Sequence, residues 1–265
     1  MAAVNKNEAC DGMEWFINYF YDALQAGAGF KLYGPGHLSC LAVIAAGVSA
    51  ACLAYRRARP PTQRALLRCA VCLCLALELS KQIVIIAAWP SYPVDQLPLH
   101  LCSLGIFVQA ADVLAPRLRK TTREILYSLS LPGAAAALLF PGWAAFPILN
   151  IYSLHSFLMH GILLCYPLLL LTSRQFRPDW RNLWRPALFI LATAGPLYFF
   201  NKHFGTNFYF INSSAPGSPL AALENLLGHP GYLLGYALLV LVIWLAMYAP
   251  IAVKLNNEPR AFGAQ

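Results

Sequence analysis

Seven long apolar runs constrain the fold of this chain more than any other feature of its sequence. They cover residues 38–55, 66–89, 97–115, 125–143, 147–171, 187–203 and 231–253. A helix of about 20 apolar residues is long enough to cross the hydrocarbon core of a bilayer. Only 11% of the residues are charged, whereas soluble domains carry about a quarter. We therefore expect an all-α polytopic membrane protein in which residues 1–265 form one domain of seven transmembrane helices.

Basic residues are concentrated in alternate loops between the apolar runs. Most of the 19 lysines and arginines lie at 56–68, 117–123 and 174–185 and in the C-terminal tail. By the positive-inside rule such loops face the cytoplasm, which places the N-terminus outside and the C-terminus inside. The net charge of +8 is thereby explained by topology, and no nucleic-acid partner is expected.

Two segments outside the apolar runs have a composition of their own. Residues 13–24 mix aromatic and acidic residues at helical spacing and are too short to span a bilayer. We expect an amphipathic helix on the membrane surface there, within an N-terminal interfacial segment 1–36 that lacks the features of a cleaved signal peptide. Residues 204–230 are rich in Asn, Gly, Ser and Pro and predict a turn-rich, lid-like loop on the outside.

The histidines share a position in this topology. Each one lies near the non-cytoplasmic end of an apolar run: His37, His100, His155, His160, His203 and His229. Imidazole changes its protonation state near neutral pH and often moves protons in catalysis. This end of the bundle is therefore the candidate site, with His100 and His203 as candidate substrate contacts.

Two opposite charges lie inside the second apolar run. Glu78 and Lys81 are three residues apart in "LELSKQ", so a helix places them on one face, where they can pair. A charge inside a membrane is costly unless it is paired or faces a polar cavity. The pair therefore either lines a substrate site or forms an internal salt bridge that locks helix packing. Asp112, near the cytoplasmic end of the third run, is expected to cap that helix or meet the nearby arginines.

Eight cysteines are present, and most lie inside the apolar runs. Buried membrane cysteine usually acts as a small apolar residue, so no disulfide framework is expected. Cys69, Cys72 and Cys74 belong to one predicted helix, but Cys74 stands about 140° around that helix from Cys69. We therefore predict no metal site and no cofactor.

Cys102, in the stretch "LPLHLCSL", is the candidate nucleophile. Pro98 suits the first turn of a helix, so Cys102 falls near the positive end of a helix dipole, which favours the thiolate. In a regular helix His100 lies about 200° around the axis from Cys102 and is a poor base for it. The fifth run offers His160, which is followed by Gly161, as first choice and His155 as second. The alternative is a buried thiol beside a hydrogen-bonded core histidine.

Four stretches in this order resemble a known family: "LPLHLCSL", "SFLMHG", "GTNFYF" and "HPGYLLG". Together they are similar to the YwaF-like bacterial integral membrane family, which is related to the animal transmembrane protein 164 group. The resemblance implies a multi-pass acyltransferase that moves fatty acyl chains between phospholipids, located in the bacterial cytoplasmic (inner) membrane. By motif it implies Cys102 as catalytic nucleophile, and it matches His160 and Asn207 to the family's histidine and asparagine.

The first function that these features favour is an enzyme. Cys102 attacks an acyl ester in the non-cytoplasmic half, and a histidine moves the proton. Backbone N–H groups at the start of the third run, or Asn207, stabilise the oxyanion. A lysophospholipid or another lipid alcohol then accepts the acyl chain, and water as the acceptor would make the protein a lipase.

The second function is a transporter or binding protein for a small polar or lipid solute. In it, Glu78, Lys81 and the histidines would line a polar path through the bundle. The sequence shows neither an internal repeat nor paired interrupted helices, which transporters often have. Its partners in either case are membrane lipids, and the sequence does not determine an oligomeric state.

Overall fold

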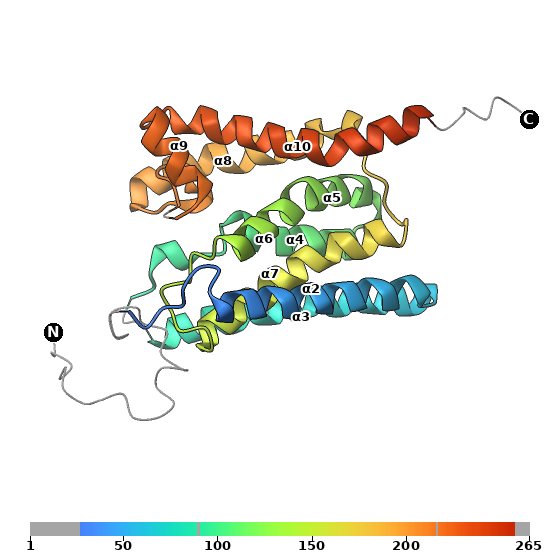
Figure 1. Ribbon diagram of the computed structural model, residues 1–265, viewed down its shortest axis with the longest axis horizontal. Coiled ribbons are helices and arrows are strands. Elements are labelled where there is room, and N and C mark those ends of the chain that lie inside the picture. Colours follow the sequence, from blue (N-terminus) through green and yellow to red (C-terminus); the bar gives the residue numbers. More distant parts are fainter. Residues whose placement is uncertain (1–26, 89–90, 216, 258–265) are drawn as a thin grey trace, which may run out of the picture.

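The computed structural model describes residues 27–88, 91–215 and 217–257, and every regular element in these ranges is helical (Figure 1). The predicted all-α class is confirmed for this part of the chain. The amphipathic helix expected at 13–24 lies outside the described residues.

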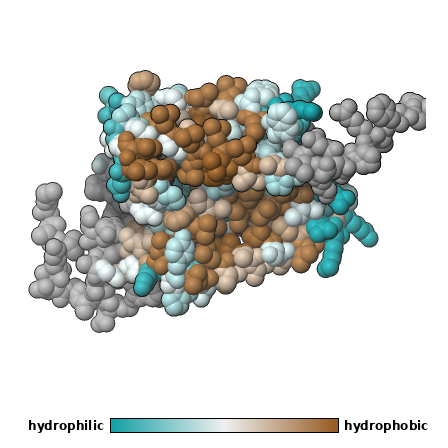
Figure 2. Space-filling model, turned by 45° about the horizontal axis from the view of Figure 1, so that its top comes forward, coloured by the Kyte–Doolittle hydropathy of each residue, from teal (hydrophilic) through white to brown (hydrophobic). Residues whose placement is uncertain are grey.

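Five helices are long and apolar enough to cross a membrane. They are α2 (Pro35–Arg57), α3 (Pro60–Ala88), α7 (Ile151–Thr172), α8 (Trp184–Phe204) and α10 (Tyr232–Asn257). Their outer faces expose large apolar side chains such as Leu79, Leu191 and Leu245. Figure 2 shows a broad apolar surface between more hydrophilic ends. Such a surface suits acyl chains rather than water, which supports a multi-pass membrane protein.

The third and fourth predicted spans form a bent pair instead of two independent long helices. The pair consists of α4 (Leu101–Leu114), η3 (Pro116–Leu118), α5 (Arg119–Ile125), the π-helical turn η4 (Leu126–Ser130) and α6 (Leu131–Leu139). Its two arms differ in direction by 114°. The first arm, α4, has 14 residues, or about 21 Å at 1.5 Å per residue, which is shorter than a bilayer core. If the pair counts as one broken span the described chain has up to six candidates, so the predicted seven are not confirmed.

The two arms of the bent pair approach each other closely at Gly105. A Cβ atom added there would lie 2.6 Å from Ser130 Oγ. Only glycine therefore fits against the π-helical turn without a shift of Ser130. This contact holds the first turns of α4 against the interior of the bundle.

Helices α8 and α10 form a second layer that packs on α5 and η4 (Figure 1). Trp244 Nε1 donates to the Ser128 carbonyl oxygen at 3.0 Å, and Tyr248 donates its hydroxyl to Glu124 at 2.8 Å. A π-helical turn leaves carbonyl groups without their usual partners, and Ser128 uses its carbonyl to bind this layer. These two hydrogen bonds attach α10 to α5 and η4 of the bent pair.

The basic loops meet at one end of the bundle, which we call the basic end. Gln175 Nε2 donates to Gln63 Oε1, and Arg123 donates to the Gln175 carbonyl oxygen. These contacts join all three basic loops. All histidine-bearing helix termini lie toward the other end, at the left of Figure 1, which we call the histidine end. Which of the two ends faces the cytoplasm remains a prediction.

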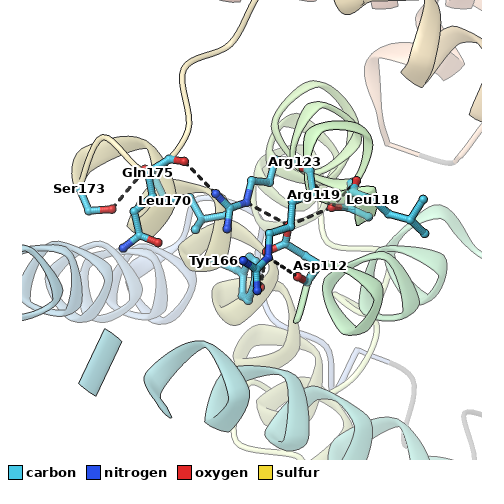
Figure 3. Close-up of polar contacts among 9 residues, drawn as sticks. Asp112, Leu118, Arg119, Arg123, Tyr166, Leu170, Ser173 and Gln175 are labelled. Carbon is cyan, nitrogen blue, oxygen red and sulfur yellow. Dashed lines mark hydrogen bonds and ion pairs between the residues drawn. The ribbon is translucent and has the colours of Figure 1, made fainter. Parts of the chain in front are cut away.

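Asp112 is the centre of the polar network at the basic end (Figure 3). Its carboxylate is 1% exposed and accepts hydrogen bonds from Arg123, Thr122 and Tyr166 at 2.8 to 3.0 Å. The Arg119 guanidinium binds the Asp112 carbonyl oxygen at 3.2 Å. The expectation that Asp112 meets nearby arginines is therefore confirmed, and its role is to join α4, α5 and α7.

Replacing Asp112 by alanine is expected to lower the free energy of unfolding by about 3 kcal/mol, the low end of the cost of breaking a buried ion pair. The low end applies because the Arg123 side chain is still 14% exposed. Thermal unfolding in detergent micelles measures this loss. Asp95→Ala serves as the control, since Asp95 is exposed in the short 3-10 helix η2 (Val94–Gln96) at the histidine end, where its carboxylate accepts a long hydrogen bond, at 3.4 Å, from Gln96. Equal stability of the two variants would contradict the prediction.

Candidate functional site

Cys102 is the second residue of α4 and lies at the histidine end. His100 occupies the N-cap position, but its side chain makes no capping hydrogen bond. The first backbone donor with an acceptor is Leu104, which binds the His100 carbonyl oxygen at 2.9 Å. Among the described residues no acceptor is found for the N–H groups of Cys102 and Ser103. The first turn of α4 therefore presents free donors and the positive end of the helix beside a thiol.

The Cys102 side chain lies against the buried apolar cluster that contains Ile106, Met159 and Leu163. On another side, the phenol groups of Tyr209 and Tyr236 are close enough to interact electrostatically with the thiol. No hydrogen bond joins the sulfur to a described residue. The thiol is therefore held in an apolar setting with two phenols nearby.

His160 has one ring nitrogen fixed and the other available. Its Nδ1 lies 2.7 Å from the Ser156 carbonyl oxygen, so Nδ1 carries the proton and Nε2 keeps its lone pair. The ring stacks on Trp143, with centroids 5.0 Å apart and an angle of 22° between the planes. The next residue, Gly161, faces Ile44 of α2, where an added Cβ atom would make an ordinary van der Waals contact at 3.5 Å. This arrangement orients the imidazole and leaves it the tautomer of a general base.

His155 shows the opposite tautomer. Its Nε2 lies 3.0 Å from the Leu77 carbonyl oxygen and donates to it, while the buried Nδ1 has no partner within the described part of the chain. A buried polar atom without a partner is uncommon and marks a candidate ligand contact. His155 therefore remains a second candidate base, tied to α3 instead of to its own helix.

Glu78 and Lys81 form the predicted ion pair, with 2.9 Å between Nζ and Oε1. Gln82 extends the pair by donating to Glu78 at 2.6 Å and to the Gln96 carbonyl oxygen at 3.0 Å, and Tyr92 donates its hydroxyl to Gln82. The network therefore joins α3 to the loop that precedes Cys102. Gln82 and Tyr92 were not predicted, because neither belongs to a charged pair or a motif.

Lys81 also connects this pair with the histidines. Its charge acts electrostatically on the rings of His100, His155 and His160. His155 and His100 in turn act on His160. The structure thus brings five of the predicted site residues into one polar cluster at the histidine end, near the start of α4.

Asn207 is engaged within its own loop. Its Oδ1 accepts from the N–H groups of Asn212 and Ser213 at 3.1 Å, and its Nδ2 donates to the carbonyl and hydroxyl oxygens of Ser213. His203 is exposed near the end of α8, with its ring against Phe204. Neither residue has a contact with Cys102 or with the other histidines in the described structure.

The loop next to Cys102 has an unusual backbone. Tyr209 and Phe210 both have positive φ, at 62° and 53°, a conformation that bulky residues rarely adopt. Buried Asn201 holds the loop by binding both the N–H and the carbonyl oxygen of Phe208 at 2.9 and 3.0 Å. The rings of Phe208 and Phe210 flank His100. Sequence reasoning missed Asn201 and Tyr209, although "GTNFYF" was a signal for this loop.

The predicted lid contains more regular structure than its composition indicated. Helix α9 (Pro219–Leu227) occupies its second half. Ser214 donates its N–H and hydroxyl to Glu224, and these hydrogen bonds lower the pKa of that carboxyl. The helix forms because Ser218 caps its first turn and Pro219 begins it.

The three cysteines of α3, for which no metal site was predicted, differ in burial. Cys69 and Cys72 are exposed on α3, whereas Cys74 is buried in the cluster that also contacts Cys102. Among the described residues no group of three or more His, Cys, Asp or Glu side chains is arranged to hold a metal ion.

One family model, described as the TMEM164 family, matches residues 32–248. The matched region includes Cys102, all six histidines and the lid. No curated protein and no solved structure matches the chain.

Proposed function

This chain belongs to the TMEM164 family, and on that basis, together with the geometry around Cys102, we propose that it is a membrane-embedded acyltransferase. It moves fatty acyl chains on phospholipids through an acyl-thioester. The reaction takes place in the half of the bilayer next to the histidine end, on the non-cytoplasmic side of a bacterial cytoplasmic membrane. The orientation follows from the positive-inside rule.

The observation that carries this proposal is the uncapped first turn of α4. The Cys102 thiol lies in the same helical turn as the free N–H groups of Cys102 and Ser103. The positive end of the helix offsets part of the cost of forming a thiolate in these apolar surroundings. The same two N–H groups offer an oxyanion hole to a carbonyl group that the sulfur attacks. Nucleophile and oxyanion donors therefore come from one rigid element.

His160 serves as the base because Nε2 keeps its lone pair while Nδ1 is held by Ser156. In the first half-reaction Nε2 takes the thiol proton, and the sulfur attacks the ester carbonyl carbon. The C–O bond to the donor lipid breaks, and the lysophospholipid oxygen leaves with the proton from His160. In the second half-reaction His160 deprotonates the acceptor hydroxyl, whose oxygen attacks the thioester. The Cys102 thiol is then restored with that proton.

The remaining residues of the polar cluster bind the lipid substrate. Lys81 provides a positive charge for the phosphate group, and Glu78, which accepts a hydrogen bond from Gln82, holds Lys81 in place. His100, fixed between Phe208 and Phe210, contacts the head group near the ester. Asn207 and His203 act from the rim of the site, where Asn207 shapes the loop over the first turn of α4.

A transporter or binding protein remains the second candidate, and Gln109 favours it. Its side chain is fully buried one turn beyond Gly105 on the Cys102 face of α4, and neither amide atom has a partner in the described structure. Unpartnered buried amides suit a polar solute or water on a path through the bundle. In this function no covalent intermediate forms.

The two functions are distinguished by a trapped intermediate. Purified protein is incubated with a diacyl phospholipid and measured by intact-protein mass spectrometry. The expected result is a mass increase of one acyl group, which hydroxylamine removes and which peptide mapping assigns to Cys102. Cys165, a partly buried thiol on α7, is the internal control and should carry none. Lipid turnover without an adduct on Cys102 would overturn the mechanism.

A further inference from the structure

A surface cavity of about 300 Å³ lies at the basic end, opposite the Cys102 site. It is formed by the start of α5 and the segment that follows α7, and its lining includes Arg119, Lys120, Arg123 and Arg177. Figure 3 labels two of these, Arg119 and Arg123, and draws the contact of Arg123 with Gln175, which also lines the cavity. The volume is at the lower end of the range for small-molecule pockets, about 300–1,000 Å³. It therefore suits a compact group rather than an acyl chain.

The positive charges of the cavity are only partly neutralised. Arg123 is paired with Asp112 at 3.0 Å. Arg119, Lys120 and Arg177 have no carboxylate within ion-pair distance among the described residues. Lys120 and Arg177 are exposed, so their charges are available to a ligand from solution or from the membrane surface.

Two carboxylates also line the cavity, but both are engaged by hydrogen-bond donors. Glu124 is 1% exposed and accepts from the Asp179 N–H, from Asn182 Nδ2 and from the Tyr248 hydroxyl at 2.8 to 3.2 Å. Asp179 accepts from the Arg181 N–H at 3.0 Å. These contacts hold the carboxylates to the frame of the cavity, and its four basic side chains outnumber these two carboxylates, so the net charge of the lining is positive.

Arg123 is held in a fixed position at the cavity wall. Its Nε binds Asp112, and its Nη1 donates to the Gln175 carbonyl oxygen at 2.8 Å. A guanidinium fixed in this way loses little conformational entropy when a ligand binds, and its planar donors match the oxygen atoms of a phosphate group.

The tryptophans beside the cavity indicate that it belongs to the level of the membrane surface. Trp180 lies between Asp179 and Asn182 of the cavity lining, and Trp184 begins α8 two residues further on. Both side chains are more than half exposed. Each is covered on one face by the next arginine along the chain, at 5.7 and 4.8 Å. Exposed tryptophans next to arginines are typical of the interface between acyl chains and water. Phosphate groups of membrane lipids are found at this depth.

We infer that this cavity binds a phosphate-bearing anion through Lys120, Arg123 and Arg177, at a site separate from the Cys102 centre. The same chemistry is present in an anionic lipid head group and in a soluble phosphate ester. A bound anion would link α5 to the segment after α7 electrostatically. It would add to the hydrogen bonds that Arg123 and Glu124 already make with that segment.

Native mass spectrometry of the full chain in neutral detergent tests the inference with three probes. Dioleoyl phosphatidylglycerol is the anionic lipid, dioleoyl phosphatidylcholine is the zwitterionic control, and glycerol 3-phosphate is the soluble ester. Wild-type protein should bind an anionic probe more tightly than phosphatidylcholine. Binding of phosphatidylglycerol that glycerol 3-phosphate does not displace identifies a lipid site. Direct binding of glycerol 3-phosphate, or displacement by it, identifies a soluble ligand.

The double variant Lys120→Gln/Arg177→Gln should bind that anionic probe about 30-fold more weakly, and each single variant about fivefold, from the attraction of one interfacial cation for anionic lipid. Arg56→Gln/Arg57→Gln removes the same charge from the exposed end of α2, outside the cavity, and should bind within about threefold of wild type. If the double variant does not fold, the single variants give the same comparison. Equal losses in the cavity and control variants, or no preference of wild type for an anion, would overturn the inference.

Discussion

Replacing Cys102 by alanine is expected to lower acyl transfer from a diacyl phospholipid by about 10⁴-fold or more. The reason is that the sulfur forms the covalent intermediate, and no other described thiol lies in the first turn of α4. The free N–H groups of Cys102 and Ser103 remain in the variant and can still polarise an ester. A small residual hydrolysis by water is therefore compatible with the mechanism. Release of lysophospholipid, followed by mass spectrometry, measures the effect.

Cys74→Ala is the matched control for this variant. Cys74 is fully buried in the apolar cluster against which Cys102 packs, so its replacement disturbs the same region without removing the nucleophile. We expect the control to keep activity within about tenfold of wild type and to lose some stability, as buried truncations do. If Cys102→Ala turned over lipid at the wild-type rate, a cysteine mechanism would be excluded.

His160→Gln is expected to lower the same activity by about 10²- to 10⁴-fold, the contribution of a general base. Glutamine keeps a side chain of similar reach, and its amide can still donate to the Ser156 carbonyl oxygen. It cannot accept a proton from the thiol. The rate should therefore fall with little change in KM. Initial rates over a range of phospholipid concentrations check both features.

His155→Gln distinguishes the two candidate bases. His155 binds the Leu77 carbonyl oxygen through Nε2, so the glutamine variant tests a position with similar burial and a similar backbone contact. We expect a loss of less than about tenfold if His155 only positions the cluster. A larger loss for His155→Gln than for His160→Gln would assign the role of base to His155, whose Nδ1 has no partner in the described chain.

Several features of the fold and the site were predictable because they depend on local sequence. The spacing of Glu78 and Lys81 alone required that they share a helix face, and the ion pair is confirmed. The apolar runs predicted α2, α3, α7, α8 and α10 to within a few residues at most ends, because their length and composition are properties of one segment. The order of short motifs predicted the TMEM164 relation.

Other features could not be predicted because they depend on residues far apart in the chain. The run at 97–115 gave no sign that the helix starts only at Leu101 and that its companion leaves at 114°. The bend lies at Ala115, between α4 and η3, and the close approach of Gly105 to Ser130 is a contact between the two arms. Asn207 looked like a catalytic amide by motif, and only the neighbouring backbone shows that Asn212 and Ser213 use its side chain.

The sequence by itself determined that this protein is helical and membrane-embedded, and that its basic residues and its histidines belong to opposite ends. These properties follow from hydrophobicity and charge summed along single segments. The tertiary structure decided which of those residues meet. It left the first turn of α4 uncapped beside Cys102, gave His160 and His155 opposite tautomers, and brought Arg123 and Arg177 to one cavity. Such contacts depend on the packing of separate helices, and no local pattern encodes them.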